Sequence, residues 1–380
     1  MRILYVTTVG GTMGFFKDLI SKLVMQGDVV DIACNDKGRS KVPPEYETLG
    51  CKVTTIDCER SPLDPSNRRA IRQIRALVED GSYDIVHCHT PVAAACTRIA
   101  CRKARRNGTK VLYTAHGFHF FTGAPLKNWL VYFPVEWICS WMTDVLITIN
   151  HEDYDRARKR LHARKVVYVP GVGVDIDRFT VDPGTREKMR EELGFANDDF
   201  VLLSVGELNK NKNTIMVIEA LAELKKNKPE IFKHLRYLAV GKGPLKDEMK
   251  SRSISYGIED RIAFLGHRGD VPDLCSAADC FVHPSMREGL AIAPLEAMAS
   301  GLPLIGSAVR GIQDYSESGV TGVCIDPHSV SELCKAIERI YGDEELRSRC
   351  AQGNPEIARR FDKPVATKAT LDVYSDVVKS

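Results

Sequence analysis

The sequence predicts an α/β protein with two doubly wound parallel sheets, one in each of two domains. Its 380 residues correspond to two domains, or three, at roughly 150 residues per domain. Short β-branched runs alternate with amphipathic segments of helical length, which is the pattern of βαβ units. The alternation occurs in two sets, and the segment Pro170–Val174 between them is rich in Pro and Gly. We therefore expect a domain boundary at this segment.

The first set contains seven predicted strands, most of them separated by helical patterns. These strands are Arg2–Val6, Val29–Ala33, Lys52–Ile56, Asp84–His87, Lys110–Thr114, Asp144–Ile149 and Val166–Val169. The second set contains six predicted strands, namely Phe200–Val205, Leu235–Val240, Arg261–Leu265, Cys280–His283, Leu302–Ile305 and Gly322–Ile325. Three predicted helices follow, at Val330–Tyr341, Glu344–Arg360 and Pro364–Val378, and Pro364 suits a helix start.

Composition excludes two classes of protein. Apolar residues make up 44% and charged residues 27% of the chain, which excludes a disordered chain and an integral membrane protein. The longest nearly uncharged stretch, Asn128–Thr143, contains Pro134 and Glu136 and is shorter than the roughly 20 residues of a membrane span. The 12 cysteines form no CxxC pair, and the N-terminus reads as a first strand rather than a signal peptide. We therefore expect reduced, buried thiols and a cytoplasmic location.

The net charge of +3 conceals two different halves of the chain. Residues 1–170 contain 25 Lys and Arg against 17 Asp and Glu, whereas the remaining residues contain 28 against 33. The basic residues of the first half gather in three clusters: Arg68, Arg69, Arg72 and Arg75; Arg102, Lys103, Arg105 and Arg106; and Arg156 to Lys165. Solvated helix faces are the ordinary interpretation of such clusters. They lack interleaved aromatic residues, so a nucleic-acid partner is not expected.

An apolar stripe at helical spacing lies beside these clusters in the sequence. Its members are Leu126, Leu130, Phe133, Trp137 and Trp141. A buried core helix is one interpretation of the stripe. A helix that contacts a membrane surface is the other, because tryptophans and neighbouring arginines favour the interface of an anionic bilayer.

The turns that follow the strands carry the candidate site residues, because ligands of open α/β sheets bind at the carboxyl ends of strands. After the first strand, Gly10 and Gly11 open a helix whose amides could approach a phosphate. The spacing is GGxxG rather than GxGxxG, so a dinucleotide site that includes Asp36 is only weakly indicated. A tight turn without a ligand is equally compatible with these glycines.

Histidines end two strands of the first set. His116 follows the fifth strand beside Gly117, where an imidazole could hydrogen-bond a ligand or exchange a proton. The alternative to a functional role is that His116 makes only a structural hydrogen bond. His87 and His89 share one face of a strand, an arrangement that is compatible with a metal site. However, no further potential ligand occurs at a suitable spacing in the sequence.

Two turns of the second set contain charged residues. The loop Gly206–Asn213 offers Lys210 and Lys212 to an anion, and a solvated basic loop is the alternative. Glu288 lies in a strand-to-helix loop, and the amides of Gly289, Leu290 and Ala291 at the expected helix start suit a pyrophosphate. Glu296 would lie about 12 Å further along the helix, a distance suited to a ribose or a sugar hydroxyl.

Three stretches together resemble a known enzyme family. They are the E-x7-E segment Glu288–Glu296, the sequence Val86–Pro91, and Ala115–His119 continued by Thr148–Asn150. With them the chain resembles, over essentially its whole length, the retaining glycosyltransferases of family 4, and in particular bacterial enzymes of capsular and exopolysaccharide assembly. The resemblance implies the GT-B fold, in which two Rossmann-like domains face a cleft and the last helix crosses back to the first domain. The expected domains are then 1–172 with 363–380, which binds the acceptor, and 173–362, which binds the nucleotide sugar.

The resemblance also implies roles for individual residues in the second domain. Glu288 corresponds to the family residue that contacts the donor-sugar hydroxyls, and Glu296 to the residue that contacts the ribose. Lys212 corresponds to the lysine that neutralises the diphosphate. One position departs from the family pattern, because Glu207 stands where an arginine is usual. Lys210 and Arg310 are the candidates to supply the missing cation.

In the first domain, Gly10 and Gly11 correspond to the loop that approaches the diphosphate, and His116 to a histidine near the sugar and the leaving group. The reaction that the resemblance implies is transfer of a sugar from a nucleotide diphosphate sugar, expected to be UDP-linked, with retention and without a metal or other cofactor. The expected acceptor is a glycan on a polyprenyl diphosphate at the inner face of the membrane. The alternatives are a UDP-sugar epimerase of the same fold and a non-catalytic partner that binds sugar nucleotides.

Overall fold

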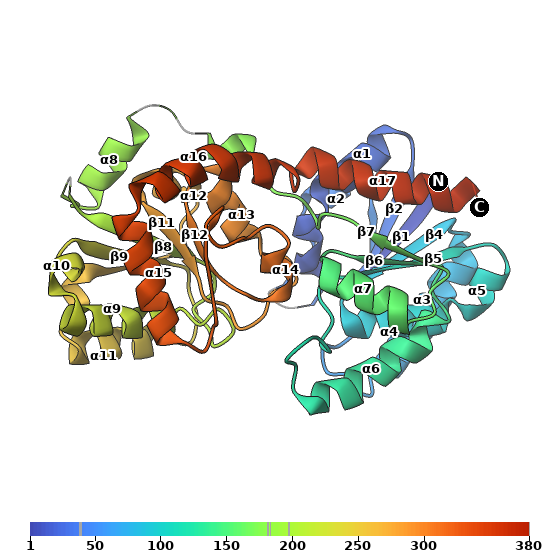
Figure 1. Cartoon of the computed structure of the whole chain (residues 1–380). Helices are drawn as coiled ribbons and strands as arrows, with labels where there is room; N and C mark the ends of the chain where they lie inside the picture. The colour runs from blue at the N-terminus through green and yellow to red at the C-terminus, as the bar shows by residue number, and fades with distance from the viewer. Residues whose placement is uncertain (38–39, 181, 183, 197, 380) are drawn as a thin grey trace. The chain divides into compact units, whose positions relative to one another are not determined.

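The computed structural model describes residues 1–37, 40–180, 182, 184–196 and 198–379. These residues form two compact units (Figure 1). Unit 1 contains Met1–Val172 and the segment from Lys363 onward, and unit 2 contains Gly173–Asp362. The division falls within the Pro- and Gly-rich segment Pro170–Val174. Each unit is built around its own parallel sheet, which has seven described strands in unit 1 and six in unit 2.

Unit 1 has the strand order β3-β2-β1-β4-β5-β6-β7. The strands are β1 (Arg2–Val9), β2 (Val29–Asn35), β3 (Lys52–Thr55), β4 (Ile85–His89), β5 (Lys110–Ala115), β6 (Val145–Thr148) and β7 (Lys165–Tyr168). Residues Ile3 to Val6 of β1 are buried, as expected for a central strand covered on both faces. The order reverses between β1 and β4, which makes the carboxyl ends of these two strands the switch point of the sheet.

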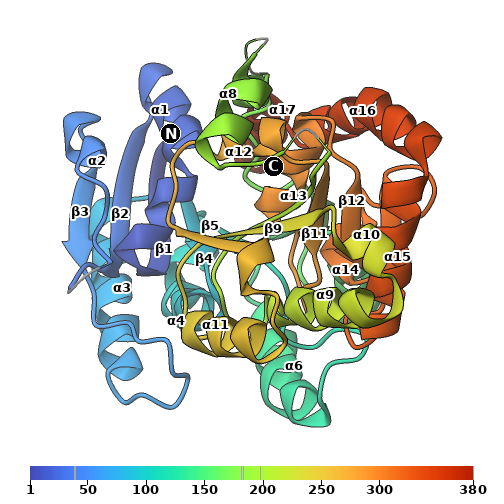
Figure 2. The same cartoon turned by 90° about the vertical axis from the view of Figure 1, so that its left-hand side faces the viewer.

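Helices cover both faces of this sheet (Figures 1 and 2). They are α1 (Lys17–Met25), α2 (Glu45–Thr48), α3 (Asn67–Gly81), α4 (Pro91–Ala100), α5 (Arg102–Arg106), α6 (Leu126–Ser140), α7 (His151–Arg160) and α17 (Lys363–Lys379), with a 3-10 helix η1 (Gly10–Phe15) before α1. The last helix, α17, lies beside α1 on one face, whereas α3, α4 and α6 lie on the other. The Tyr374 hydroxyl holds α17 to the sheet, 2.5 Å from the hydroxyl of Tyr5 and 2.6 Å from His87 Nδ1.

Helix α6 is attached to α4 by a buried ion pair. Both terminal guanidinium nitrogens of Arg98, Nη1 and Nη2, donate to the Glu136 carboxylate, at 2.8 and 3.0 Å. Glu136, which interrupts the apolar stretch in the sequence, therefore points inward, and the exposed charged residue of α6 is Lys127 in its first turn. The large apolar residues exposed on and just beyond this helix are Leu126, Leu130, Val131, Val135, Trp137, Ile138 and Trp141. A fully buried core helix is thus the wrong interpretation of the stripe, of which only Phe133 is half-buried against the core.

Unit 2 has the strand order β10-β9-β8-β11-β12-β13. The strands are β8 (Phe200–Val205), β9 (Leu235–Val240), β10 (Ile262–Gly266), β11 (Cys280–His283), β12 (Leu304–Ser307) and β13 (Gly322–Ile325). The helices are α8 (Thr185–Glu192), α9 (Ile215–Asn227), α10 (Pro229–Phe232), α11 (Lys246–Ser255), α12 (Val271–Ala277), α13 (Ile292–Ala299), α14 (Arg310–Gln313), α15 (Val330–Gly342) and α16 (Glu344–Arg359). Apolar residues of α9 and α15 pack together on one face of the sheet. The order reverses between β8 and β11, the switch point of this unit.

The cysteines are free thiols, and all except the half-buried Cys324 are buried. Burial raises the pKa of several of these thiols, that of Cys101 to about 12. They therefore behave as apolar core residues. In the part of the chain that the structure describes, no helix is both long and apolar enough to cross a bilayer.

Candidate functional site

Two loops meet at the switch point of unit 2, although they lie about 75 residues apart in the chain. One follows β8 and contains Asn211 to Asn213, and the other follows β11 and contains Pro284 to Ala291. The Met286 amide donates to the Asn211 carbonyl at 2.8 Å, and the Asn211 side chain donates to the Arg287 carbonyl at 3.1 Å. Parallel strands place their carboxyl ends at the same edge of the sheet, so both charged loops that the sequence indicates belong to one site.

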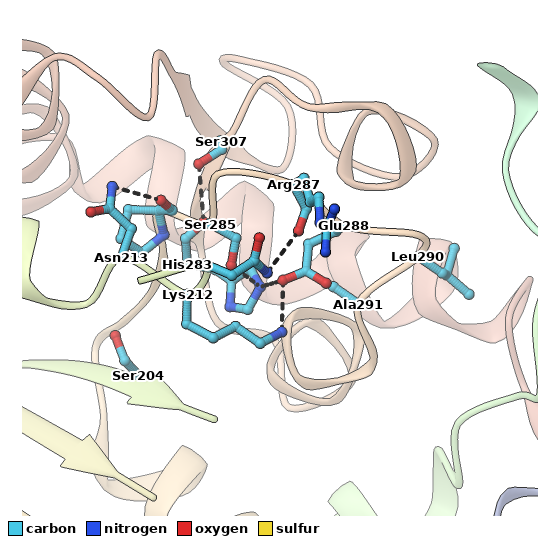
Figure 3. Close-up of polar contacts among 12 residues, drawn as sticks. Ser204, Lys212, Asn213, His283, Ser285, Arg287, Glu288, Leu290, Ala291 and Ser307 are labelled. Carbon is cyan, nitrogen blue, oxygen red and sulfur yellow. Dashed lines mark hydrogen bonds and ion pairs between the residues drawn. The ribbon is translucent and has the colours of Figure 1, made fainter. Parts of the chain in front are cut away.

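The centre of this site is a cluster of Lys212, His283, Ser285 and Glu288 (Figure 3). The Lys212 ammonium lies 2.6 Å from Glu288 Oε1, and His283 Nε2 lies 3.1 Å from the same oxygen. The Ser285 hydroxyl lies 3.0 Å from His283 Nε2. The exposed fraction of the side chain is 25% for Lys212 and 11% for Glu288. The Glu288 carboxylate is thus largely shielded by protein, while a quarter of the Lys212 side chain remains exposed.

Charge and hydrogen bonding determine the protonation states in this cluster. Burial alone would raise the pKa of the Glu288 carboxyl, but the hydrogen bonds from His283 and Lys212, together with the charges of these groups at the acidic pH where the carboxyl titrates, lower it to about 2. Burial lowers the pKa of His283, so at neutral pH its uncharged ring donates to Glu288 through Nε2. Glu288 is therefore a carboxylate at neutral pH, able to accept hydrogen bonds but not to release a proton.

Arg310 is the second cation of this site. It is buried at the start of α14, and its Nε donates to the Glu288 carbonyl at 2.7 Å. A Cβ on the neighbouring Gly311 would lie 2.0 Å from the Gly289 carbonyl, so only glycine allows this close approach. Of the two candidates for the missing cation, Arg310 contacts the backbone of the site, whereas Lys210 is exposed. The exposed Glu207 accepts a hydrogen bond from Asn209 at 2.8 Å.

The helix after Glu288 begins later than the sequence analysis expects. Helix α13 starts at Ile292, and Ala291 precedes it with a φ of +67°. Gly289 and Leu290 are therefore loop residues, and the Leu290 side chain is buried while its carbonyl accepts from the Tyr315 hydroxyl at 2.9 Å. The expectation that all three amides of residues 289–291 lie at the helix start is wrong. The predicted distance of about 12 Å to the half-buried Glu296 assumed helix from Glu288 onward, and that assumption does not hold for residues 288–291.

Three hydrogen-bonded histidines lie at the switch point of unit 1, of which His87 and His89 are buried and His116 is half-buried. His116 Nε2 at the end of β5 lies 3.2 Å from His89 Nδ1, and burial lowers the pKa of His116 to about 4. His87 is bonded at both nitrogens, to the Tyr374 hydroxyl and, at 2.8 Å, to the Thr114 hydroxyl. His87 therefore has no nitrogen left for a metal ion. Across the described residues, no three His, Cys, Asp or Glu side chains are grouped as metal ligands.

Gly10 and Gly11 lie in η1 and pack against the segment at Ser40 to Val42. A Cβ on Gly10 would lie 2.4 Å from the Val42 nitrogen, and one on Gly11 would lie 2.6 Å from the Ser40 hydroxyl. The Asp36 carboxylate accepts from the Val42 amide at 2.5 Å. This packing explains both glycines and Asp36 without a ligand, and the helix that they open is 3-10 rather than α.

Sequence reasoning missed three residues of the unit 2 site. His283 and Ser285 flank Pro284 at the end of β11, and Asn213 donates to the Pro284 carbonyl at 3.1 Å with a φ of +54°. The signal for His283 was its position as the last residue of a predicted strand. Nothing in the spacing indicates that its ring turns toward Glu288.

Comparisons with known proteins agree with this architecture. Residues 185–356 match the family described as Glycosyl transferases group 1, and residues 2–150 match the one described as Glycosyl transferase 4-like. The putative glycosyltransferase EpsD of Bacillus subtilis is 39% identical over 348 residues, which cover 91% of this chain and 88% of that protein. The UDP-Gal:alpha-D-GlcNAc-diphosphoundecaprenol alpha-1,3-galactosyltransferase of Escherichia coli is 28% identical over 313 residues, 82% of this chain and 80% of that protein.

Solved structures share the fold. Anabaena HepE in complex with UDP and glucose has a TM-score of 0.78 at 22% identity, covering 99% of this chain and 100% of the other. WaaG, a glycosyltransferase involved in lipopolysaccharide biosynthesis, has a TM-score of 0.75 at 19% identity, covering 98% and 99%. The chain therefore belongs to the group 1 glycosyltransferases, and its two parallel-sheet units have the GT-B fold.

Proposed function

We propose that this protein is a retaining glycosyltransferase of family 4 that transfers a sugar from a UDP-sugar to a hydroxyl of a lipid-linked glycan during polysaccharide assembly. The observation that carries the proposal is the pairing of Lys212 with Glu288 at the switch point of unit 2. A cation and a carboxylate at this point match a donor that carries a diphosphate at one end and sugar hydroxyls at the other.

The chemistry follows from the charges of this cluster. Lys212 stabilises the negative charge that develops on the departing diphosphate, so no metal ion is required. Glu288 accepts hydrogen bonds from the donor-sugar hydroxyls, and Glu296 binds the ribose. The acceptor hydroxyl attacks on the face that the diphosphate leaves, and a leaving phosphate oxygen takes its proton. No protein nucleophile takes part in this mechanism.

The proposed donor and acceptor find support in the relatives. HepE was crystallised with UDP and with UDP-glucose. The name of the Escherichia coli relative specifies a UDP-galactose donor and a diphosphoundecaprenol-linked acceptor. We extend the uridine nucleotide and the polyprenyl diphosphate, but not the particular sugar, to this chain.

Unit 1 supports a peripheral contact with the cytoplasmic face of the membrane. The exposed apolar face of α6 ends in Trp137 and Trp141, which are 41% and 57% exposed. Such residues favour the membrane interface. Several arginines of the basic clusters are engaged in ion pairs, as Arg105 is with Asp144, so the apolar face rather than charge alone supports the contact. Flotation with anionic vesicles tests it: we expect salt-sensitive binding that Trp137→Glu weakens, and absence of binding contradicts it.

Transfer of radiolabelled sugar tests the function itself. A thermal-shift panel of UDP-, GDP- and ADP-sugars first identifies the donor, and the expected result is stabilisation by a UDP-sugar. Incubation of that donor with lipid extracts should then yield a labelled glycolipid. NMR of the donor with enzyme alone separates the alternatives, because an epimerase forms product without any acceptor. UDP binding without transfer to any lipid acceptor would indicate the non-catalytic partner.

A further inference from the structure

His89 is a buried residue of unit 1 that the sequence connects only with a metal site, and the comparisons assign it no role. It is 1% exposed at the end of β4, and its ring centroid lies 4.3 Å from that of Phe16 and 5.6 Å from that of Tyr5. Its Nδ1 lies 3.2 Å from His116 Nε2. Its Nε2 is buried and, among the described residues, has no hydrogen-bond partner. One nitrogen of His89 is thus bonded to His116, and the other is buried without a hydrogen-bond partner among the described residues.

Both rings of this pair are neutral. Burial, with smaller contributions from His87 and His116, lowers the pKa of His89 well below its ordinary value. Burial likewise lowers the pKa of His116 to about 4. A hydrogen bond between two neutral imidazoles contains one proton, so one ring donates and the other accepts.

Two arrangements of protons satisfy this bond. If His116 Nε2–H donates to His89 Nδ1, the proton of His89 lies on Nε2 as a buried N–H without an acceptor. If His89 Nδ1–H donates to His116 Nε2, the buried Nε2 of His89 is a bare acceptor. Among buried backbone groups, orphaned N–H donors are rarer than under-satisfied carbonyl acceptors, and we apply the same preference to the imidazole ring. The second arrangement is therefore favoured, and it places the proton of His116 on Nδ1.

We propose that His89 is a positioning residue that holds His116 in the Nδ1–H tautomer, so that His116 offers an N–H donor to an oxygen of the bound substrate. His116 is half-buried, and its Nδ1 has no hydrogen bond to any described residue. The oxygen would belong to a sugar hydroxyl or to a phosphate. This identification of the oxygen rests on the proposed function, whereas the tautomer does not.

His87 provides the matched control. It is equally buried, lies two residues before His89 on the same face of β4, and its ring centroid is 4.2 Å from that of His89. Both of its nitrogens are bonded to hydroxyls, and neither is bonded to His116. A change at His87 therefore disturbs the same region without removing the donor to His116.

The test is nitrogen-15 NMR of the ring nitrogens of His116 in the full-length protein, read from long-range couplings to the ring protons. The expected result is a protonated Nδ1 and a bare Nε2 in the native protein and in His87→Gln. In His89→Leu the tautomer should become mixed or reversed. A protonated Nε2 in the native protein overturns the proposal, as does an unchanged tautomer in His89→Leu.

Activity provides the second readout. In His89→Leu we expect kcat to fall at least tenfold. His89→Asn, whose amide N–H lies near the position of Nδ1, should recover activity to within about threefold of native. Equal losses in both variants would contradict positioning through this hydrogen bond. If His89→Leu fails to fold, the spectrum of the native protein and the activity of His89→Asn still decide the question. If no transfer occurs with any donor, the proposed function fails while the NMR result stands by itself.

Discussion

The two units each contain a short ion pair, and the pairs differ in how completely the protein encloses them. In unit 1, the side chains of Arg98 and Glu136 are 1% and 7% exposed and share two hydrogen bonds. In unit 2, Lys212 and Glu288 share one hydrogen bond, and Lys212 is 25% exposed. An enclosed pair holds two helices together, whereas a pair that is open on one side is available to an anion.

The histidines at the two switch points also differ in the groups to which they are hydrogen-bonded. In unit 1 three neutral histidines are linked to hydroxyls or to one another, whereas in unit 2 His283 is linked to a carboxylate. Both units have the same sheet topology at this edge. This comparison indicates that the loops, rather than the sheets, determine the chemistry of each switch point.

The largest expected effect concerns the enclosed pair. Arg98→Ala leaves Glu136 as a buried, unpaired carboxylate, so the free energy of unfolding should fall by about 3–5 kcal/mol. Urea denaturation measures this loss of free energy of unfolding. The double variant Arg98→Met with Glu136→Leu is the control and should recover most of the loss. A loss in the single variant below about 1 kcal/mol would mean that the pair is more hydrated than its burial indicates.

The next effect is the acid sensitivity of unit 1. Burial lowers the pKa of His87 to about 3, whereas the unfolded chain takes up this proton near pH 6.5. The contribution of His87 to stability is therefore complete above pH 6.5 and is lost as the pH falls toward 3, by about 1.4 kcal/mol per pH unit. Urea denaturation between pH 6 and 4 should show that the free energy of unfolding falls with decreasing pH, and that His87→Gln reduces this slope by about 1.4 kcal/mol per pH unit.

Glu288 should contribute to acid sensitivity in a lower pH window. Its folded pKa of about 2 lies below the ordinary value of 4.5, so its contribution is present above pH 4.5 and disappears between pH 4.5 and 2. A Glu288→Gln variant should match the native slope between pH 6 and 5. A changed slope in that range would indicate that the Glu288 carboxyl, or the His283 ring hydrogen-bonded to it, titrates there.

The open pair should dominate turnover instead of stability. Lys212→Ala and Glu288→Gln should each lower the rate of sugar transfer at least tenfold, because one removes the cation beside the diphosphate and the other the charge that orients the sugar. Transfer from radiolabelled UDP-sugar measures it. The matched control is Lys210→Ala, which changes an exposed lysine of the same loop and should remain within about twofold of native. Near-native rates in both site variants would refute the assigned roles.

The smallest expected effect concerns the attachment of α17 to unit 1. Tyr374→Phe removes the hydroxyl that bridges Tyr5 and His87, and the free energy of unfolding should fall by about 1 kcal/mol. Hydrogen exchange should show faster exchange of α17 amides with little change in α15 of unit 2. Uniform destabilisation of both units would instead indicate that they unfold together.

Several features of the fold could be predicted from the sequence because they depend on local composition. Every strand is a short apolar or β-branched run, and the predicted segments match the observed strands within a few residues. Lys212 and Glu288 could be singled out for the same reason, since each follows a predicted strand. The start of α13 could not be predicted, because Ala291 adopts a positive φ that is unusual for alanine, and the Tyr315 hydroxyl from a distant segment bonds the carbonyls of Leu290 and Ala291.

By itself, the sequence determined the fold class, the two sets of strands and the family, because these depend on periodicity and on motifs that are local in the chain. Only the tertiary structure decided which side chains meet. In unit 2 it places His283 beside the Glu288 carboxylate and Arg310 beside the Glu288 carbonyl. In unit 1 it pairs Glu136 with Arg98 and His89 with His116. Such pairings arise from strand order and from loop packing between distant segments, and no spacing along the chain specifies them.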